Sequence, residues 1–502
     1  MKILKSDLSK LFAIAALLVL TAFSYPVINK AGFSKYQNPP DWVKEVGAKT
    51  VPIGKRIFKV NSYGAVNDGN TMNTKFIQKA IDACAANGGG IVTFDTGEYV
   101  TGSIFLKSGV TLKIDKSVKI LGSQDINDYP IINTRVAGIE MPWPAALINV
   151  LDQKNVLITG EGIIDGRGKP FWDKYWAMRK VYDPKGIRWA ADYDCRRPRL
   201  MLISGSENIT LKGLHLQRSG FWTVHVLYSK HITVDGITIQ NNIGGHGPST
   251  DGIDIDSSTY ILVENSDIDC NDDDFCLKAG RDADGLRVNR PTEYVVIRHC
   301  IARKGGGLCT FGSETSGGIR HVLVENSTAI GTANGVNFKS AFTRGGTVED
   351  IHIENLKMEN VNTAINLNVN WNPKYSYTTL PAGYNYDSIP PYWKVMLQKV
   401  PPSKGTPTIQ NVFISNITGT DCKTAINAVG MNTSPLKNFE LKNIKISANS
   451  AGKIEHAKDW DFDNINISSK DNSKVQIEDA ENVNFNKTKS RKAKDGLRNS
   501  FD

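Results

Sequence analysis

From Asn155 onward, hydrophobic and polar positions alternate in short runs that recur along the chain. Each run alternates apolar, mostly β-branched residues with polar or small ones and closes with Asn, Gly or Asp, as in NVLITGEGIIDG, NITLKGLHLQ, HITVDGITIQ, YILVENSDID and HVLVENSTAI. A period of two is typical of β-strands, whereas an amphipathic helix has a period of 3.6. The pattern therefore predicts short strands separated by turns.

These runs repeat at a nearly fixed interval. They begin at Asn155, Asn208, His231, Tyr260, Tyr294, His321, Asp350, Asn411 and Asn438, mostly 23 to 34 residues apart, with two larger gaps of 53 and 61. Such a period is typical of stacked coils in which each strand pairs in parallel with its counterpart in the next coil. A propeller would need blades of about 40 to 45 residues and frequent hairpins, and hairpin signals are sparse. We expect an all-β fold, a single-stranded, right-handed parallel β-helix.

Three segments depart from the strand pattern. Residues 74–87 (TKFIQKAIDACAAN) have apolar residues at helical spacing and end at three glycines, which predicts a helix capping the N-terminal end of the solenoid. Residues 171–193 and 371–393 break the period and are rich in aromatic residues. We expect them to be long loops beside a groove, where their rings either stack on a ligand or form a small core of their own.

The two ends of the chain differ from its centre. MKILKSDLSK is followed by 13 apolar residues, a pattern typical of a secretory signal and too short for a comfortable membrane span. We therefore predict a signal peptide at 1–24, a β-helix domain at 25–485 and a basic tail at 486–502. The protein is expected to be exported, to the periplasm, the cell surface or the medium.

Charge and cysteine content narrow the possible partners. Sixty Lys and Arg against 51 Asp and Glu give a formal charge of +9, which fits a polyanionic ligand. The basic tail is typical of a solvated segment, so no nucleic-acid partner is expected. Seven cysteines without a CxxC or Cys/His pattern predict neither a disulfide scaffold nor a metal site. Cys270, Cys276, Cys300 and Cys309 are interpreted as small buried core residues.

Acidic residues gather in two segments, STDGIDID (249–256) and CNDDDFCLK (270–278). Asp251 and Asp272 are 21 residues apart, close to one coil, so they should lie on successive coils about 4.8 Å apart. The next two coils bring Gly306 and Lys339 to the same face, after 34 and 33 residues. Asp272 and Asp273 would point to opposite sides of a regular strand, so the backbone must turn there for both to face one cleft.

Such a cluster fits acid–base chemistry. Crowded carboxylates raise the pKa of one of their number, and a carboxylic acid beside a carboxylate is what hydrolysis of a glycosidic bond requires. The alternative is structural, because Asp and Asn also close turns by side-chain hydrogen bonds.

At these residues the chain resembles glycoside hydrolase family 28, the polygalacturonases and their relatives. STDGIDID, NDDDFCLKAGRDADG, GGGLCTFGSETSGG and GVNFKSAFTRGG follow the family's order and spacing, and the likeness extends roughly from Phe58 to Asn438. It implies a pectin-lyase-like solenoid and an inverting reaction, with Asp272 as general acid and Asp251 and Asp273 holding the attacking water. An inverting site generally leaves about 6.5 to 9.5 Å between acid and base.

The same resemblance suggests substrate-binding residues and shows three departures. Lys339 matches the family lysine that binds a substrate carboxylate, and Lys278 closes the second acidic segment. Gly306 stands where the family has the His of GHG, Asn337 where it has the Arg of RIK, and Ser249 where it has the Asn of NTD.

The missing arginine bears on the substrate. Losing a charge-assisted contact to galacturonate should weaken its binding by about 1.5 to 3 kcal/mol. The missing cationic group has several candidate replacements in the sequence: His246, Arg281, Arg287 or Arg290.

We therefore predict an enzyme, a glycoside hydrolase of galacturonic-acid-containing pectin that is polygalacturonase-like, with rhamnogalacturonan or exo-galacturonidase specificity as options. It should act as a monomer, without cofactor or metal. Two alternatives are a non-catalytic carbohydrate-binding β-helix and a calcium-dependent pectate lyase with Asp251, Asp254 and Asp256 as ligands. The sequence leaves endo against exo action undecided.

Overall fold

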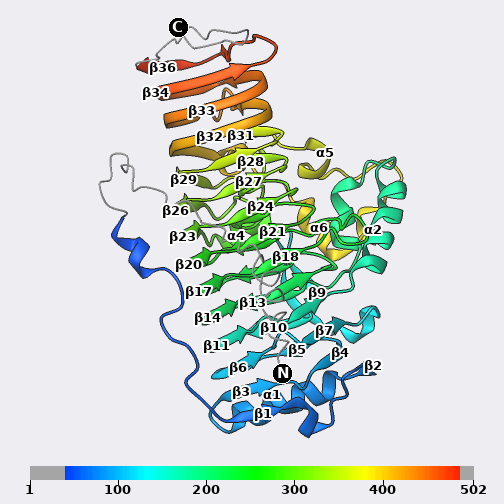
Figure 1. Ribbon diagram of the computed structural model, residues 1–502. Coiled ribbons are helices and arrows are strands. Elements are labelled where there is room, and N and C mark those ends of the chain that lie inside the picture. The colour runs from blue at the N-terminus through cyan, green and yellow to red at the C-terminus, as the bar shows by residue number, and fades with distance from the viewer. Residues whose placement is uncertain (1–39, 487–502) are drawn as a thin grey trace, which may run out of the picture. The chain divides into compact units, whose positions relative to one another are not determined.

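In the computed structural model, which describes residues 40–486, the chain winds into coils whose strands form three parallel sheets (Figure 1). The first sheet contains β1 (Ile57–Lys59), β3 (Gly90–Thr93), β6 (Val110–Lys113), β11 (Lys154–Thr159), β14 (Glu207–Lys212), β17 (Lys230–Asp235), β20 (Thr259–Glu264), β23 (Thr292–Arg298), β26 (Ile319–Glu325), β29 (Thr347–Glu354) and β36 (Glu481–Asn486). The second contains β2 (Asp68–Met72), β4 (Gly97–Thr101), β7 (Val118–Gly122), β12 (Ile163–Asp165), β15 (His215–Gln217), β18 (Thr238–Gln240), β21 (Asp267–Asp269), β24 (Ile301–Arg303), β27 (Thr328–Ile330) and β30 (Lys357–Glu359).

The third sheet carries the site described below. It contains β5 (Ile104–Phe105), β10 (Ile148–Leu151), β13 (Met201–Ser204), β16 (Val224–Leu227), β19 (Ile253–Asp256), β22 (Phe275–Lys278), β25 (Cys309–Phe311), β28 (Asn334–Lys339), β31 (Thr363–Asn368) and β35 (Gln476–Glu478). Near the C-terminal end, the long strands β32 (Thr408–Val429), β33 (Leu436–Glu455) and β34 (Ala457–Ser469) continue from one sheet into the next. The parallel β-helix predicted from the repeat is confirmed; the predicted signal peptide and nearly all of the tail lie outside the described residues.

The recurrent first residue of each run is a corner of the coil. All nine of these residues have a left-handed backbone, with φ between 52° and 57°. Strand pairing passes over them, for example from Lys154↔Glu207 directly to Val156↔Ile209. Asn and Asp tolerate this conformation, whereas His and Tyr do so less readily. At four successive corners the rings of His231, Tyr260, Tyr294 and His321 stack 4.7 to 4.9 Å apart, which offsets that strain.

The interior of the coils is a continuous hydrophobic core of aliphatic side chains with a few aromatic ones. All seven cysteines are free and buried, and Cys270, Cys300 and Cys309 belong to this core as predicted. Helix α1 (Thr74–Ala86) buries Ile77, Ile81 and other apolar residues against the first coils. The predicted capping helix is confirmed.

The insertions contain short helices rather than loops alone. The first forms α2 (Lys169–Tyr182), η4 (Arg188–Ala190) and α3 (Ala191–Asp194); the second forms α5 (Pro373–Ser376), η5 (Tyr386–Ser388), α6 (Pro391–Met396) and, beyond it, α7 (Pro402–Gly405). The antiparallel hairpin β8 (Ile131–Val136) and β9 (Ile139–Pro144) projects beside them, as does α4 (Asp282–Val288). The remaining helical turns are η1 (Asp41–Glu45), η2 (Val60–Tyr63) and η3 (Ile126–Asp128).

The insertions and the hairpin share a second hydrophobic core. It is built from both insertions, the hairpin and two rings of the turn before β16, and its aromatic members are Trp143, Trp189, Tyr193, Phe221, Trp222 and Trp393. The rings of Trp189 and Trp393 lie 4.9 Å apart, and Asp194 accepts hydrogen bonds from Tyr182, Tyr392 and Trp393. These contacts join two segments almost 200 residues apart in the sequence. We call this assembly the wall.

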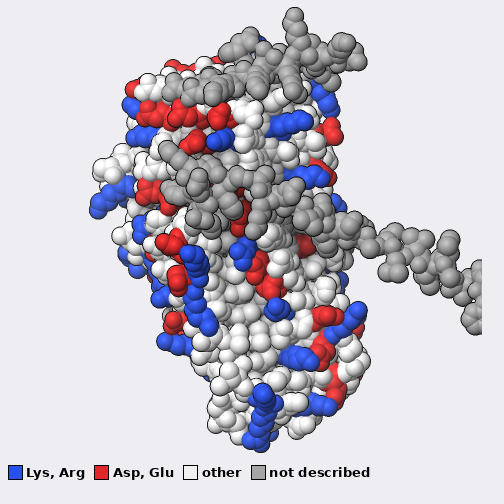
Figure 2. Space-filling model, turned by 60° about the vertical axis from the view of Figure 1, so that its left-hand side comes forward, with Lys and Arg blue, Asp and Glu red and all other residues white. Residues whose placement is uncertain are grey.

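Charged side chains do not gather into one field on the face shown in Figure 2, where acidic and basic residues are interspersed with uncharged areas. Ion pairs between successive coils explain part of the mixing; Arg298–Glu264, Arg303–Asp267 and Arg320–Glu293 all have N–O distances of 2.7 to 2.8 Å. Within residues 40–486, no helix has the length and apolarity needed to cross a bilayer.

Candidate active site

The candidate site lies on the outer side of the third sheet, across four successive coils. The acids precede the strands: Asp251 lies two residues before β19, and Asp272 and Asp273 lie in the turn before β22. Lys278 and Lys339 are the last residues of β22 and β28. The strand register pairs β19, β22, β25 and β28 consecutively, so the side chains predicted to stack do so.

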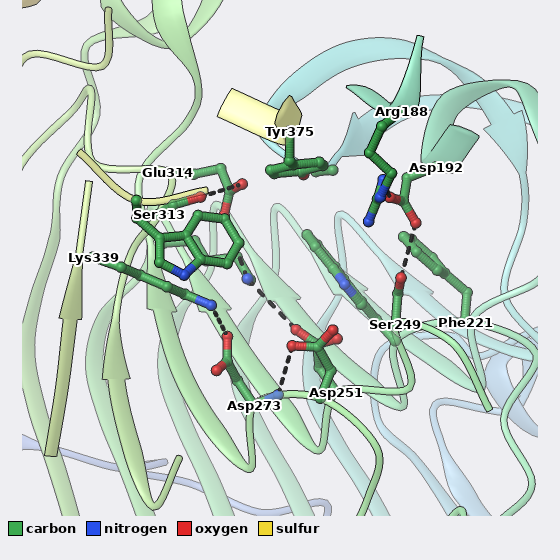
Figure 3. Close-up of a pocket in the computed structure, with 15 residues that line it drawn as sticks. Arg188, Asp192, Phe221, Ser249, Asp251, Asp273, Ser313, Glu314, Lys339 and Tyr375 are labelled. Carbon is green, nitrogen blue, oxygen red and sulfur yellow. Dashed lines mark hydrogen bonds and ion pairs between the residues drawn. The ribbon is translucent and has the colours of Figure 1, made fainter. Parts of the chain in front are cut away.

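One oxygen from each of Asp251, Asp272 and Asp273 lies within 4.8 Å of the other two. All three line one pocket (Figure 3). The turn needed to bring Asp272 and Asp273 to one side is present, and the amide of Asp273 donates to Oδ1 of Asp272 at 3.0 Å. Their nearest oxygens are closer together than the about 6.5 to 9.5 Å that generally separates the acid and the base of an inverting enzyme.

Lys339 and Lys278 partly compensate the acids. Lys339 Nζ lies 2.7 Å from Oδ2 of Asp273, whose Oδ1 accepts from the Thr310 hydroxyl at 2.9 Å. Lys278 Nζ lies 3.4 to 3.5 Å from Asp251, Asp254 and Glu314. Each ammonium also faces an indole ring, Lys339 at 4.5 Å from Trp371 and Lys278 at 4.8 Å from Trp222, which favours the charged form.

This arrangement shifts the pKa values of Asp272 and Asp273 in opposite directions. Burial and the adjacent Asp273 raise the pKa of Asp272. Burial alone would also raise the pKa of Asp273, but Lys339 and Lys278 hold it below its usual value. At a pH between the two values, Asp272 carries a proton and Asp273 does not, as required of an acid and a base.

Asp254 is a buried acid that the sequence analysis considered only as a calcium ligand. It lies on β19 with an oxygen within 4.8 Å of Asp251, and neither of its oxygens accepts a hydrogen bond from the described residues. Burial raises the pKa of Asp254 to about 7; burial and Asp254 raise that of Asp251 well above its usual value. Both shifts favour the protonated forms of these two carboxyls.

The opposite side of the pocket belongs to the wall. Ala137, Phe221 and Trp222 are shared between the pocket and the second core, and Tyr375 comes from the second insertion. Arg188 of η4 lines the pocket across from Lys339 (Figure 3). The sequence analysis singled out the stretch containing Arg188 but not the residue, because nothing local indicated where the insertion would fold.

Asn337, Gly306 and His246 do not line the pocket. Asn337 is buried in a ladder of amides, accepting from Asn366, which in turn accepts from Asn427. Gly306 packs on the acid turn, where an added Cβ would lie 2.8 Å from Oδ1 of Asp273. His246 is exposed, and its ring stacks on Trp176.

The three arginines suggested as replacements are engaged elsewhere. Arg281 is fully buried against Asp282 and Tyr193, Arg287 pairs with Glu140 and Asp284, and Arg290 donates to the carbonyl of Tyr228.

Of the three acids suggested as calcium ligands, Asp251 and Asp254 lie together, but Asp256 does not join them. Asp256 instead pairs with Arg135, whose Nη1 donates to it at 2.8 Å. The cation beside these last two acids is the ammonium of Lys278. Cys276, interpreted as a core residue, instead lies on the outer side of β22 and donates to Oδ2 of Asp273 at 3.4 Å.

Comparison with known proteins agrees with the resemblance. Residues 86–386 match the family described as glycosyl hydrolases family 28. A probable polygalacturonase of Vitis vinifera is 33% identical over 313 residues, which are 60% of this chain and 60% of that protein. An exo-poly-alpha-D-galacturonosidase of Dickeya chrysanthemi is 27% identical over 82% of this chain and 71% of its own length. The chain thus spans between about three fifths and seven tenths of these two relatives.

Solved structures extend the likeness to the fold. The hyperthermoactive exopolygalacturonase of Thermotoga maritima superposes with a TM-score of 0.67 and 26% identity, over 87% of this chain and 94% of that one. The match to the family covers more than half of the chain and includes all four coils that carry the acids and lysines. The chain belongs to glycosyl hydrolases family 28.

Proposed function

We propose that the protein hydrolyses glycosidic bonds in galacturonic-acid-containing pectin. The observation that carries this proposal is the pair Asp272 and Asp273, adjacent acids in one pocket with pKa values shifted in opposite directions. Relatives named polygalacturonase or exo-poly-alpha-D-galacturonosidase support the substrate class.

The geometry supports the following division of roles. Asp272, the least buried of the three acids, protonates the leaving oxygen. Asp273, kept ionised by Lys339, accepts a proton from water, and Asp251 holds that water. Inversion follows when this water attacks the anomeric carbon on the face opposite the leaving oxygen, forming the new C–O bond as the glycosidic C–O bond breaks.

The first test is incubation of the purified protein with polygalacturonan and, separately, rhamnogalacturonan. We expect new reducing ends without the absorbance of an unsaturated uronate, and a fall of about 10²- to 10⁴-fold in turnover for Asp272→Asn. Unchanged turnover in that variant would remove the acid assignment. An unsaturated product whose formation stops when a chelator is added would favour a calcium-dependent lyase. Binding of the polysaccharide without any product would favour a carbohydrate-binding protein.

We further propose action at chain ends. The wall shares Ala137, Phe221 and Trp222 with the pocket and so limits one side of it. An end-acting enzyme releases short products from the first minutes while polymer viscosity stays high. A rapid fall in viscosity with few reducing ends would instead indicate internal cleavage.

Export and a monomeric state are also proposed. The N-terminal segment 1–24 has the pattern of a secretory signal, and a polymer outside the cell is a substrate that export would bring within reach. N-terminal sequencing of the mature protein checks export by showing whether the signal segment is removed. Light scattering checks the monomeric state by giving the molar mass in solution.

A further inference from the structure

The pocket has three cationic side chains among the described residues that line it, Arg188, Lys278 and Lys339. Lys278 and Lys339 lie within the acid cluster and are outnumbered there by carboxylates. Arg188 stands apart from that cluster, on the opposite side of the pocket (Figure 3).

The charge around Arg188 is unbalanced. Its Nη1 donates to Oδ2 of Asp192 at 3.0 Å, while Nη2 of Arg197 donates to Oδ1 of the same carboxylate at 2.8 Å. Asp192 also accepts from the hydroxyls of Ser249 and Tyr175. Two guanidinium groups share one carboxylate, so one positive charge is left over.

The excess charge faces the pocket at Arg188. The side chain of Arg197 is 0% exposed, held between the rings of Tyr175 and Phe221, with its other terminal nitrogen on the carbonyl of Pro248. The side chain of Arg188 is 19% exposed and lies over the ring of Tyr375 at 5.1 Å. Asp192 and Tyr375 fix the guanidinium before any ligand arrives, and a fixed planar fork suits a carboxylate better than a flexible ammonium does.

On this geometry, and resting on the proposed function, we infer that Arg188 is a specificity-determining residue that binds the carboxylate of the sugar on the wall side of the cleaved bond. Lys339 faces the sugar on the other side. The acids lie between these two cations, so the preferred substrate carries a carboxylate on both sides of the bond. A polysaccharide that alternates acidic and neutral sugars would offer a carboxylate to only one of these two cations, Arg188 or Lys339.

The test measures binding of trigalacturonate and of its fully methyl-esterified form by calorimetry, in an Asp272→Asn background that prevents turnover. Adding Arg188→Gln should weaken trigalacturonate binding by about 10- to 100-fold. It should leave binding of the neutral ester unchanged, because no carboxylate is left to lose. Arg320→Gln is the matched control, since Arg320 pairs with Glu293 on the outside of the coils and should change neither affinity.

Two outcomes would overturn the assignment: trigalacturonate binding equal to that of the background, or equal losses for the acid and the ester, which would indicate a purely structural role. Arg188→Lys keeps the positive charge but not the planar guanidinium. It should weaken trigalacturonate binding less than Arg188→Gln does and leave binding of the ester unchanged. If Arg188→Gln does not fold, Arg188→Lys replaces it in the test. Wild-type turnover of trigalacturonate separates the two proposals. If turnover occurs and Arg188→Gln is neutral, only the role of Arg188 fails; if neither turnover nor binding occurs, the proposed function fails as well.

Discussion

Lys339 acts on two titrating groups at once, because it touches Asp273 and lies near Asp272. It lowers the pKa of both acids, which have opposite duties in the proposed reaction. A base must be ionised, so activity is lost as the pH falls through the pKa of Asp273. An acid must be protonated, so activity is lost as the pH rises through the pKa of Asp272.

Replacing this lysine should therefore move the whole pH profile. In Lys339→Met both pKa values rise, so both limbs of the plot of kcat against pH should shift to higher pH, in addition to any loss of substrate affinity. Lys357→Met, which removes an exposed lysine paired with Glu359, should leave both limbs in place. A profile that falls in height without moving would show that Lys339 does not set these pKa values.

Gly306, which stands where the family has a histidine, leaves space for the carboxylate of Asp273. A Cβ at this position would lie 2.8 Å from Oδ1 and 3.1 Å from the amide nitrogen of Asp273. That oxygen is held by Thr310, so the carboxylate would have to leave its hydrogen bond. We expect Gly306→Ala to lower kcat by about 10- to 100-fold, as misplacement of a reacting group does.

The comparison for Gly306→Ala is Gly245→Ala, whose added Cβ would meet nothing closer than 3.5 Å. Both variants should melt near the wild-type temperature. Full activity in Gly306→Ala would mean that the turn carrying Asp273 yields without consequence.

Among the elements, the wall is held by a few long-range contacts. Trp393 of α6 is 4% exposed, packs on Trp189 and donates to Asp194 at 2.8 Å. Trp393→Ala should weaken the wall locally by about 3 to 5 kcal/mol while leaving the coils intact.

The expected signs of this change are faster proteolysis within residues 371–397, unchanged far-ultraviolet circular dichroism and a larger share of internal cleavage. Tyr386→Ala, in the same insertion but 51% exposed, should change none of the three. Loss of the whole β-sheet signal would show that wall and coils unfold together.

At the scale of the whole molecule, the repetitive part was predictable and the insertions were not. The alternation in each run fixed the strands, and the spacing from Asp251 to Lys339 placed the acids and the lysine on one face, because parallel coils keep the same register. Arg188 escaped prediction because its position depends on Trp189 meeting Trp393, a contact that no local period encodes. Asp254 was predicted only as a possible calcium ligand, because alternation alone does not say which polar residue of a strand lies beside the acids of a cleft.

The stacking of coils also bears on how such a chain can change over time. Because each coil touches only the coils before and after it, the four that carry the acids and lysines form a cassette about 14 Å long, three steps of about 4.8 Å. Coils can be gained or lost beyond this cassette without moving its reacting groups. The insertions can meanwhile diverge freely, since they enter the cassette only from the side. The reacting acids thus lie on the coils, whereas part of the proposed choice of substrate, at Arg188, lies on an insertion.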